Sequence, residues 1–282
     1  MPKIFYTDTS SEYWRGDAGL AHRDLATGAD VEPPPEVRRY LFAGTQHGPG
    51  VLPLVDASMF GSRGANWLNV VDYRPLFRAA LENLRMWIAE GVEPPASMFP
   101  RAENGSAATR EEVLDSLAAI PGMSLPRADR LPAIAPMDLG EHAGAGVPDF
   151  PARFVGEPYP TCVSAVDPTG NEIAGIRMPD VAIPVATHAG FNPRHPDSGG
   201  EGQILEYLGS TVPLAPDTGA RAKTADPRPS LAERYASRDA YLTAVRAAAE
   251  LLADARYLLP ADIELCVALA RDRLGAVSGR GA

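Results

Sequence analysis

His47 and two carboxylates near the start of the chain are the side chains best suited to acid–base chemistry. The stretch YLFAGTQHGPG, residues 40–50, places His47 in a glycine-rich loop directly after an apolar run. Ligands of open α/β sheets bind where the strands end, which favours a catalytic base over a loop histidine with a structural hydrogen bond. Such a base needs a carboxylate to orient its far ring nitrogen. Asp8 and Glu12 are both available, because they closely follow the preceding predicted strand.

The segments around these residues predict the order strand, acid, strand, histidine, helix. Residues 3–7 and 37–44 are short, largely apolar runs bounded by turn residues, which is typical of strands. Between residues 66 and 91, apolar side chains recur at helical spacing. Pro75 suits the first turn of that helix and Gly91 suits its C-terminal cap.

The whole pattern divides the chain into three expected regions. Residues 1–102 hold the strands, the acids and the histidine. Residues 103–229 are Pro-rich and irregular, with a short helix capped by Thr109 and two β-like runs. Residues 230–282 are expected to be helical, with a capping box of Ser230 and Glu233 and a final helix starting at Pro260.

Five stretches of the sequence together resemble a bacterial α/β-hydrolase-domain family of esterase-like enzymes. They are FYTDTSSEYWRGDAGL, VRRYLFAGTQHGPG, NWLNVVDYRPLFRAAL, MPDVAIPVATHAGFNPRHP and ARYLLPADIE. The resemblance covers nearly the whole chain, but the chain is similar to only the C-terminal portion of that family's protein. It implies an α/β fold that comprises the last strands and helices of an α/β-hydrolase, a Pro-rich irregular region and C-terminal helices.

The resemblance implies a carboxylic-ester hydrolase of the Ser–acid–His type, acting on a small-molecule ester without a cofactor. His47 matches the family's histidine loop, and Glu12 of SSEYW is the preferred acid. Asp8 is the alternative acid because it lies nearer the strand end. The aromatic side chains of Tyr13 and Trp14, next to the acid, are expected to form an apolar wall for an acyl or aryl group.

A nucleophile for this histidine is missing from the sequence. The α/β-hydrolase fold requires Gly-x-Ser-x-Gly before the acid, and that pattern occurs nowhere in the 282 residues. The chain is therefore expected to be a fragment, or to be completed by an N-terminal hydrolase chain or a second copy, or to have rebuilt its site around a local nucleophile. The local candidates, each expected to be structural, are Ser10, Ser11, Ser58, Ser62 and Cys162.

Two other functions compete with the esterase. One is a non-catalytic binding or regulatory module derived from a hydrolase. The other is a metal-dependent hydrolase whose ligands come from the loop THAGFNPRHPDSGGEG, namely His188, His195, Asp197 and Glu201. Because this spacing fits no standard zinc pattern, no metal is expected.

Arg194 in the same loop has two possible roles. It could bind a substrate carboxylate with two hydrogen bonds, or it could form an ion pair with Asp180 or Asp197. The ion pair is the favoured expectation, and the substrate role stays open.

The composition excludes several classes of partner. A net charge of −10 repels phosphate backbones, so nucleic acid is not expected as a partner. No apolar run is long enough for a membrane span. The N-terminus has no basic segment followed by a long apolar core, which favours a cytoplasmic protein.

Overall fold

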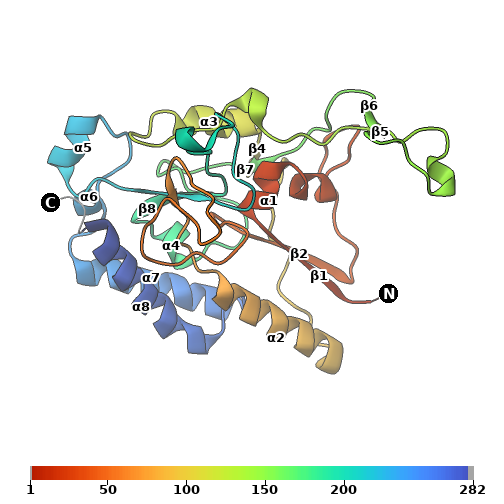
Figure 1. Cartoon of the computed structure of the whole chain (residues 1–282). Coiled ribbons are helices and arrows are strands. Elements are labelled where there is room, and N and C mark those ends of the chain that lie inside the picture. The colour runs from red at the N-terminus through yellow and green to blue at the C-terminus, as the bar shows by residue number, and fades with distance from the viewer. Residues whose placement is uncertain (1, 279–282) are drawn as a thin grey trace.

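Two parallel strands carry the first part of the chain in the structure, a computed structural model that describes residues 2–278. Strand β1 (Ile4–Thr9) pairs with β2 (Val37–Phe42), and the register sets Thr9 beside Phe42. Both strands therefore end at the same edge of the sheet, and the segments that follow them begin side by side (Figure 1). Glu12 follows β1 and His47 follows β2, so the strand pairing brings their segments together.

Three long helices lie together along one side of the molecule (Figure 1). They are α2 (Arg74–Glu90), α7 (Arg238–Asp254) and α8 (Ile263–Ser278). The shorter helices are α1 (Ser10–Arg15), α3 (Arg110–Leu117), α4 (Pro179–Ala182), α5 (Thr218–Thr224) and α6 (Leu231–Arg234). The 3-10 turns are η1 (Ala18–His22), η2 (Ala128–Arg130), η3 (Ala143–Ala145), η4 (Pro196–Ser198) and η5 (Pro260–Asp262). Among residues 2–278, no helix combines the length and the apolar character needed to cross a membrane.

Strand β2 is flanked on both edges. Opposite β1 it forms isolated parallel bridges with Met98 and Ile176. Its side chains alternate between two cores, as expected for a strand buried on both faces. Tyr40 and Phe42 pack in a cluster with residues of α2, α4, α7 and α8, whereas Leu41 packs in a second cluster on the other face.

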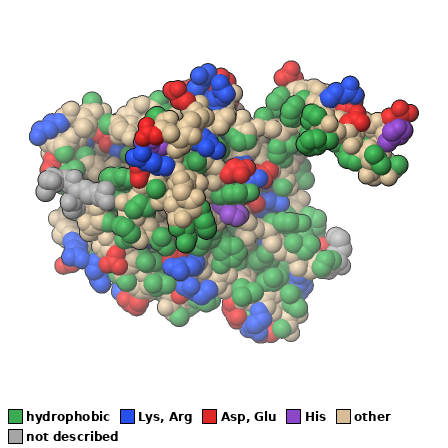
Figure 2. Space-filling model, viewed as in Figure 1, with side chains coloured by type: hydrophobic (Ala, Val, Ile, Leu, Met, Phe, Trp, Pro, Cys, Tyr) green, Lys and Arg blue, Asp and Glu red, His purple; other side chains and the backbone are tan. Residues whose placement is uncertain are grey.

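The remaining strands form small antiparallel sheets. One has the order β3 (Trp67–Leu68), β9 (Ser210–Pro213), β8 (Ala186–Ala189). Two further pairs are β4 (Ala107–Ala108) with β7 (Val163–Ser164), and β5 (Met137–Asp138) with β6 (Arg153–Phe154). The arm that carries β5 and β6 projects from the body of the molecule (Figures 1 and 2).

Several local predictions are confirmed. Helix α2 contains Pro75 in its first turn and ends at Gly91, which has a left-handed φ of 73°. The hydroxyl of Thr109 accepts a hydrogen bond at the start of α3, as predicted.

The prediction of a long helical stretch from residue 230 is only partly right. Ser230 and Glu233 form the expected capping box, but it belongs to the four-residue helix α6. Tyr235 is extended, and the next helix, α7, starts with its own cap at Ser237.

Candidate active site

The carboxylate of Glu12 lies in hydrogen-bond contact with the His47 ring, with Oε1 2.6 Å from Nδ1. Glu12 is the third residue of α1, and its other oxygen, Oε2, accepts a hydrogen bond of 2.7 Å from the backbone N–H of Thr9. The capping box of this short helix therefore fixes one carboxylate oxygen and directs the other at the histidine. The remaining ring nitrogen, Nε2, is the one left for a reacting group.

The His47 backbone is held on both sides. Its N–H donates to the carbonyl oxygen of Tyr207 at 3.1 Å, and its carbonyl accepts from the hydroxyl of Tyr73. The His47 side chain is 59% exposed while that of Glu12 is 16% exposed. The pair thus has a protected acid and an accessible base, which is the arrangement that general base catalysis needs.

Tyr207 is a site residue that the sequence did not reveal. Its ring packs on the His47 ring with a centroid distance of 4.6 Å, and the guanidinium of Arg15 lies over the same tyrosine ring at 4.8 Å. Tyr207 has a φ of 66°, a left-handed conformation that costs free energy for a bulky residue and tends to occur at functional sites. No periodicity or motif in the segment around Tyr207 marks it in advance.

Asp8, the alternative acid, is engaged elsewhere. Its Oδ2 lies 2.6 Å from Nη1 of Arg39, which is buried. Burial raises the pKa of the Asp8 carboxyl, and the Arg39 guanidinium opposes that rise. The structure therefore brings Glu12 to His47 and leaves Asp8 in a separate ion pair.

A cavity of about 570 Å³ opens beside His47. Its polar lining residues include Gln46, Asn69, Glu206, Ser58 and Ser62. The apolar lining side chains are Val51, Leu52, Val55, Met59, Phe60 and Leu208. This cavity could accommodate an apolar acyl or aryl group next to the base.

The expectation that Tyr13 and Trp14 form an aromatic wall at the site is wrong. Tyr13 is 0% exposed and Trp14 is 2% exposed, and both belong to the hydrophobic core. The Tyr13 hydroxyl lies 3.0 Å from Nε2 of His22, and the Trp14 ring contacts the Phe191 ring at a centroid distance of 4.4 Å. Because consecutive residues of a helix point about 100° apart, Glu12 can face the histidine while these two neighbours face the core.

Arg194 does not form the favoured ion pair. Asp180 pairs with Arg273, and Asp197 lies 3.2 Å from Arg63, so both expected partners are taken. Arg194 instead lines a second cavity of about 540 Å³, which shares Tyr207 and three other lining residues with the first cavity. Its Nε is buried and has no hydrogen-bond partner among residues 2–278.

The metal alternative is not supported by the described part of the chain, where no group of three or more His, Cys, Asp or Glu side chains could hold an ion. His188 is buried in β8, and its Nδ1 lies 3.1 Å from the Thr211 hydroxyl. Burial lowers the pKa of His188 to about 3. His195 instead precedes the surface turn η4 and accepts a hydrogen bond from the Asp197 backbone. The two histidines are thus held in separate structural roles.

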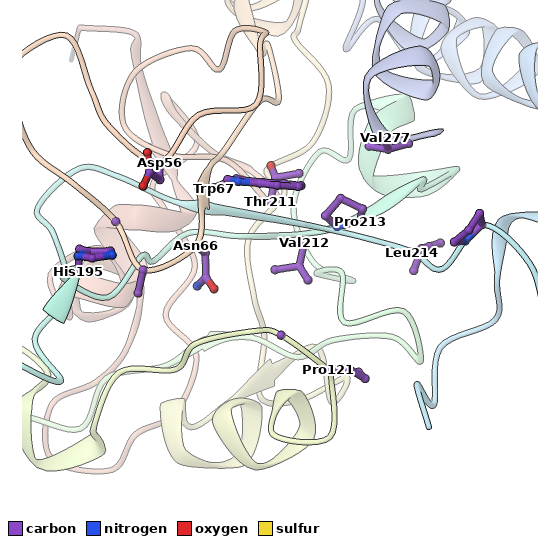
Figure 3. A pocket seen from close by; sticks show the side chains of 14 residues that line it. Asp56, Asn66, Trp67, Pro121, His195, Thr211, Val212, Pro213, Leu214 and Val277 are labelled. Atoms are coloured by element: carbon purple, nitrogen blue, oxygen red, sulfur yellow. The ribbon is translucent and has the colours of Figure 1, made fainter. Parts of the chain in front are cut away.

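The local nucleophile candidates divide into two groups. Ser10, Ser11 and Cys162 are buried, and burial raises the pKa of the Cys162 thiol. Ser58 and Ser62 line the cavity beside His47. Another cavity, of about 450 Å³, lies against β3 and β9 (Figure 3), but its lining contains neither Glu12 nor His47.

A comparison with protein-family models matches residues 1–268 to the family described as alpha/beta hydrolase domain. The match extends over nearly the whole chain, and it does not confirm that the likeness is restricted to the family's C-terminal portion. No curated protein and no solved structure matches the chain. The mixture of helices and strands is consistent with that family.

Proposed function

The chain belongs to the alpha/beta hydrolase domain family, and from this membership we propose that it takes part in carboxylic-ester hydrolysis of the Ser–acid–His type. The family supports hydrolytic chemistry in general, and the ester is our inference. The observation that carries it is the contact of 2.6 Å between Glu12 and His47 beside a largely apolar cavity. A carboxylate that orients an accessible histidine next to an apolar pocket suits acyl transfer.

Each residue has a defined role in this proposal. Glu12 holds the His47 ring with its Nδ1 proton toward the carboxylate and stabilises the imidazolium. Nε2 of His47 takes the proton of a serine hydroxyl as the serine attacks the ester carbonyl, and the protonated ring then donates to the leaving alcohol. In the second step, the same nitrogen activates a water that hydrolyses the acyl-enzyme. The acyl group occupies the cavity formed by Val51, Met59, Phe60 and their neighbours.

We infer that the serine nucleophile lies on another chain, because no Gly-x-Ser-x-Gly pattern occurs in this one. The partner that supplies it is a complementary hydrolase chain, because a second copy of this chain would lack the same pattern. A covalent serine probe separates this assignment from a local nucleophile. The chain alone should not react with a fluorophosphonate, whereas labelling lost on Ser58→Ala or Ser62→Ala would reveal a local serine.

The first test is hydrolysis of p-nitrophenyl butyrate by the purified chain. Without a nucleophile, the pair can still act as a general base on water, so we expect slow turnover that falls by about 10²–10⁴-fold in His47→Ala. His142→Ala, a change at an exposed histidine, is the matched control and should behave as wild type. Equal rates for wild type and His47→Ala would refute catalysis by this chain.

The second candidate function is a binding module that has kept the pocket of a hydrolase. The missing nucleophile pattern and the intact cavity beside His47 favour it. Equal rates in the assay above, together with saturable binding of p-nitrophenol or butyrate to the cavity, would support the module over the enzyme.

A further inference from the structure

A buried carboxylate, that of Glu172, lies beneath the candidate active site and contacts both of the segments that carry it. Its Oε2 accepts a hydrogen bond of 2.6 Å from the Ser10 hydroxyl and one of 2.9 Å from the backbone N–H of Gly44. Ser10 is the first residue of α1, which carries Glu12, and Gly44 opens the loop that carries His47. We propose that Glu172 is a positioning residue that sets the geometry of the Glu12–His47 pair.

The Ser10 hydroxyl makes a further hydrogen bond to the loop that carries His47. It donates to Glu172 and accepts a hydrogen bond of 3.3 Å from the backbone N–H of Thr45. Both Ser10 and Thr45 are 0% exposed. Two backbone N–H groups of the histidine loop are thus linked to the first turn of the acid helix through one serine and one carboxylate.

Close packing leaves this network little freedom to shift. Gly44 has a left-handed φ of 67°, and a Cβ there would lie 2.9 Å from Cγ2 of Val181. A Cβ on Gly190 would lie 2.4 Å from the backbone of Ser10. The carbonyl of Gly44 is also held, by Nδ2 of Asn69 at 2.8 Å. The start of α1 and the start of the histidine loop are therefore closely packed at the point where Glu172 joins them.

Glu172 itself is held by the turn that precedes it. The backbone N–H of Asp167 donates to the Asn171 carbonyl at 2.8 Å, and Nδ2 of Asn171 donates to the Ala186 carbonyl at 3.0 Å. An isolated bridge also pairs Val166 with Glu172. A rigid turn therefore presents the carboxylate to the site.

The electrostatics argue against a purely stabilising role. Glu172 is 3% exposed and forms no ion pair with a basic side chain of residues 2–278. Burial raises the pKa of Glu172 to about 7, against the opposing effect of its two hydrogen-bond donors. A buried acid without an ion-pair partner costs folding free energy relative to an apolar residue, so a carboxylate at this position fits a role in geometry.

The test measures the His47 ring directly and does not depend on catalysis, although the proposal rests on the function proposed above. In alkaline buffer, ¹⁵N shifts of both ring nitrogens of His47 report which nitrogen carries the proton. We expect wild type to hold the proton on Nδ1, toward Glu12. In Glu172→Ala, the shifts should move toward the averaged values of a free imidazole, and toward those of Glu12→Ala.

Glu172→Gln is the conservative rescue, because its side-chain oxygen can accept both hydrogen bonds, and it should retain the wild-type shifts. Ser10→Ala removes the link without touching the carboxylate and should shift His47 in the same direction as Glu172→Ala, so the test remains decisive if Glu172→Ala does not fold. Glu157→Ala, at an exposed site, is the control. Unchanged His47 shifts in folded Glu172→Ala or in Ser10→Ala would overturn the proposal.

Ester hydrolysis provides a second readout. Loss of positioning should lower kcat by about 10²-fold, the order expected for a displacement near 1 Å, with little change in KM. If wild type proves inactive, catalysis by this chain on its own fails, and the NMR comparison still decides the positioning role.

Discussion

Both carboxylate oxygens of Glu12 are engaged at once, and this explains why a glutamate suits its position. Oε2 accepts from the Thr9 backbone and Oε1 faces Nδ1 of His47. These two donors lie at different oxygens, and a glutamine has an acceptor oxygen on one side only, so it can face the Thr9 N–H or the His47 ring but not both. The acid that caps the helix is therefore the same group that orients the base.

This arrangement predicts opposite effects for two carboxylate-to-amide changes. Glu12→Gln should lower kcat/KM by about 10²–10⁴-fold, because the histidine loses its oriented tautomer, while the fold remains stable. Asp8→Asn should leave kcat/KM within about threefold, yet it should cost about 1–3 kcal/mol of unfolding free energy because the buried Arg39 loses its partner. Ester hydrolysis and urea denaturation of both variants measure the two effects. A larger catalytic loss in Asp8→Asn would return Asp8 to the role of acid.

Residue types and spacing predicted this pair, but not its surroundings. The strand-end position of His47 and the nearby acids are visible in the sequence. The burial of Tyr13 and Trp14 is not, because the SSEYW segment is too short for its periodicity to show which side chains face inward. Tyr207 and Glu172 lie more than 100 residues along the chain from the His47 loop that they contact, so only the folded structure reveals them.

At the scale of elements, the loop after β2 is shaped by contacts of its backbone. Gly50 donates its N–H to the Val71 carbonyl at 2.8 Å, and a Cβ at this position would lie 2.3 Å from the Val70 backbone. At Gly48, only two residues earlier, a Cβ would meet nothing within 4 Å. Close packing therefore requires a glycine at position 50, whereas no steric contact requires one at position 48.

Alanine substitutions at the two glycines test this difference in packing. Gly50→Ala should destabilise the protein by roughly 1–3 kcal/mol, because the added methyl group collides with backbone that cannot move aside. Gly48→Ala should change stability by less than about 1 kcal/mol, with a gain expected from the lower entropy of the unfolded chain. Thermal unfolding of both variants gives the comparison. A Gly48→Ala variant less stable than Gly50→Ala would contradict the steric account of this loop.

Helices and strands were predictable from the sequence where a segment is long or where its apolar residues recur regularly. Helix α2 and the two parallel strands follow from apolar spacing, and their bounds were nearly right. The strands β3, β4 and β7 have two residues each, which is too short for any period to show. At the break between α6 and α7, the extended Tyr235 donates its hydroxyl hydrogen to the Pro184 carbonyl, a contact that the local sequence does not indicate.

At the scale of the whole molecule, buried titratable groups connect stability to pH in two opposing directions. Burial lowers the pKa of His22 to about 4 and of His188 to about 3. The unfolded chain binds protons at these histidines below about pH 6.5, so their contribution to stability is lost as the pH falls from there. Glu172 acts in the opposite sense. Its pKa rises from 4.5 to about 7 on folding, so its contribution is present at low pH and is lost as the pH rises through 7.

The two histidines together carry larger shifts than Glu172. Asp8, whose pKa is raised, acts with Glu172, whereas the carboxylates whose pKa is lowered, such as Asp72 and Asp226, act with the histidines. We expect the unfolding free energy of wild type to decrease as the pH falls from 7 to 4. Glu172→Gln removes the opposing contribution, so its decrease between pH 7 and pH 4.5 should be steeper than that of wild type by roughly 3 kcal/mol. Urea denaturation at several pH values measures both curves. Parallel curves would mean that Glu172 does not change its protonation between these pH values, and that the buried carboxyl remains in one state beneath the site.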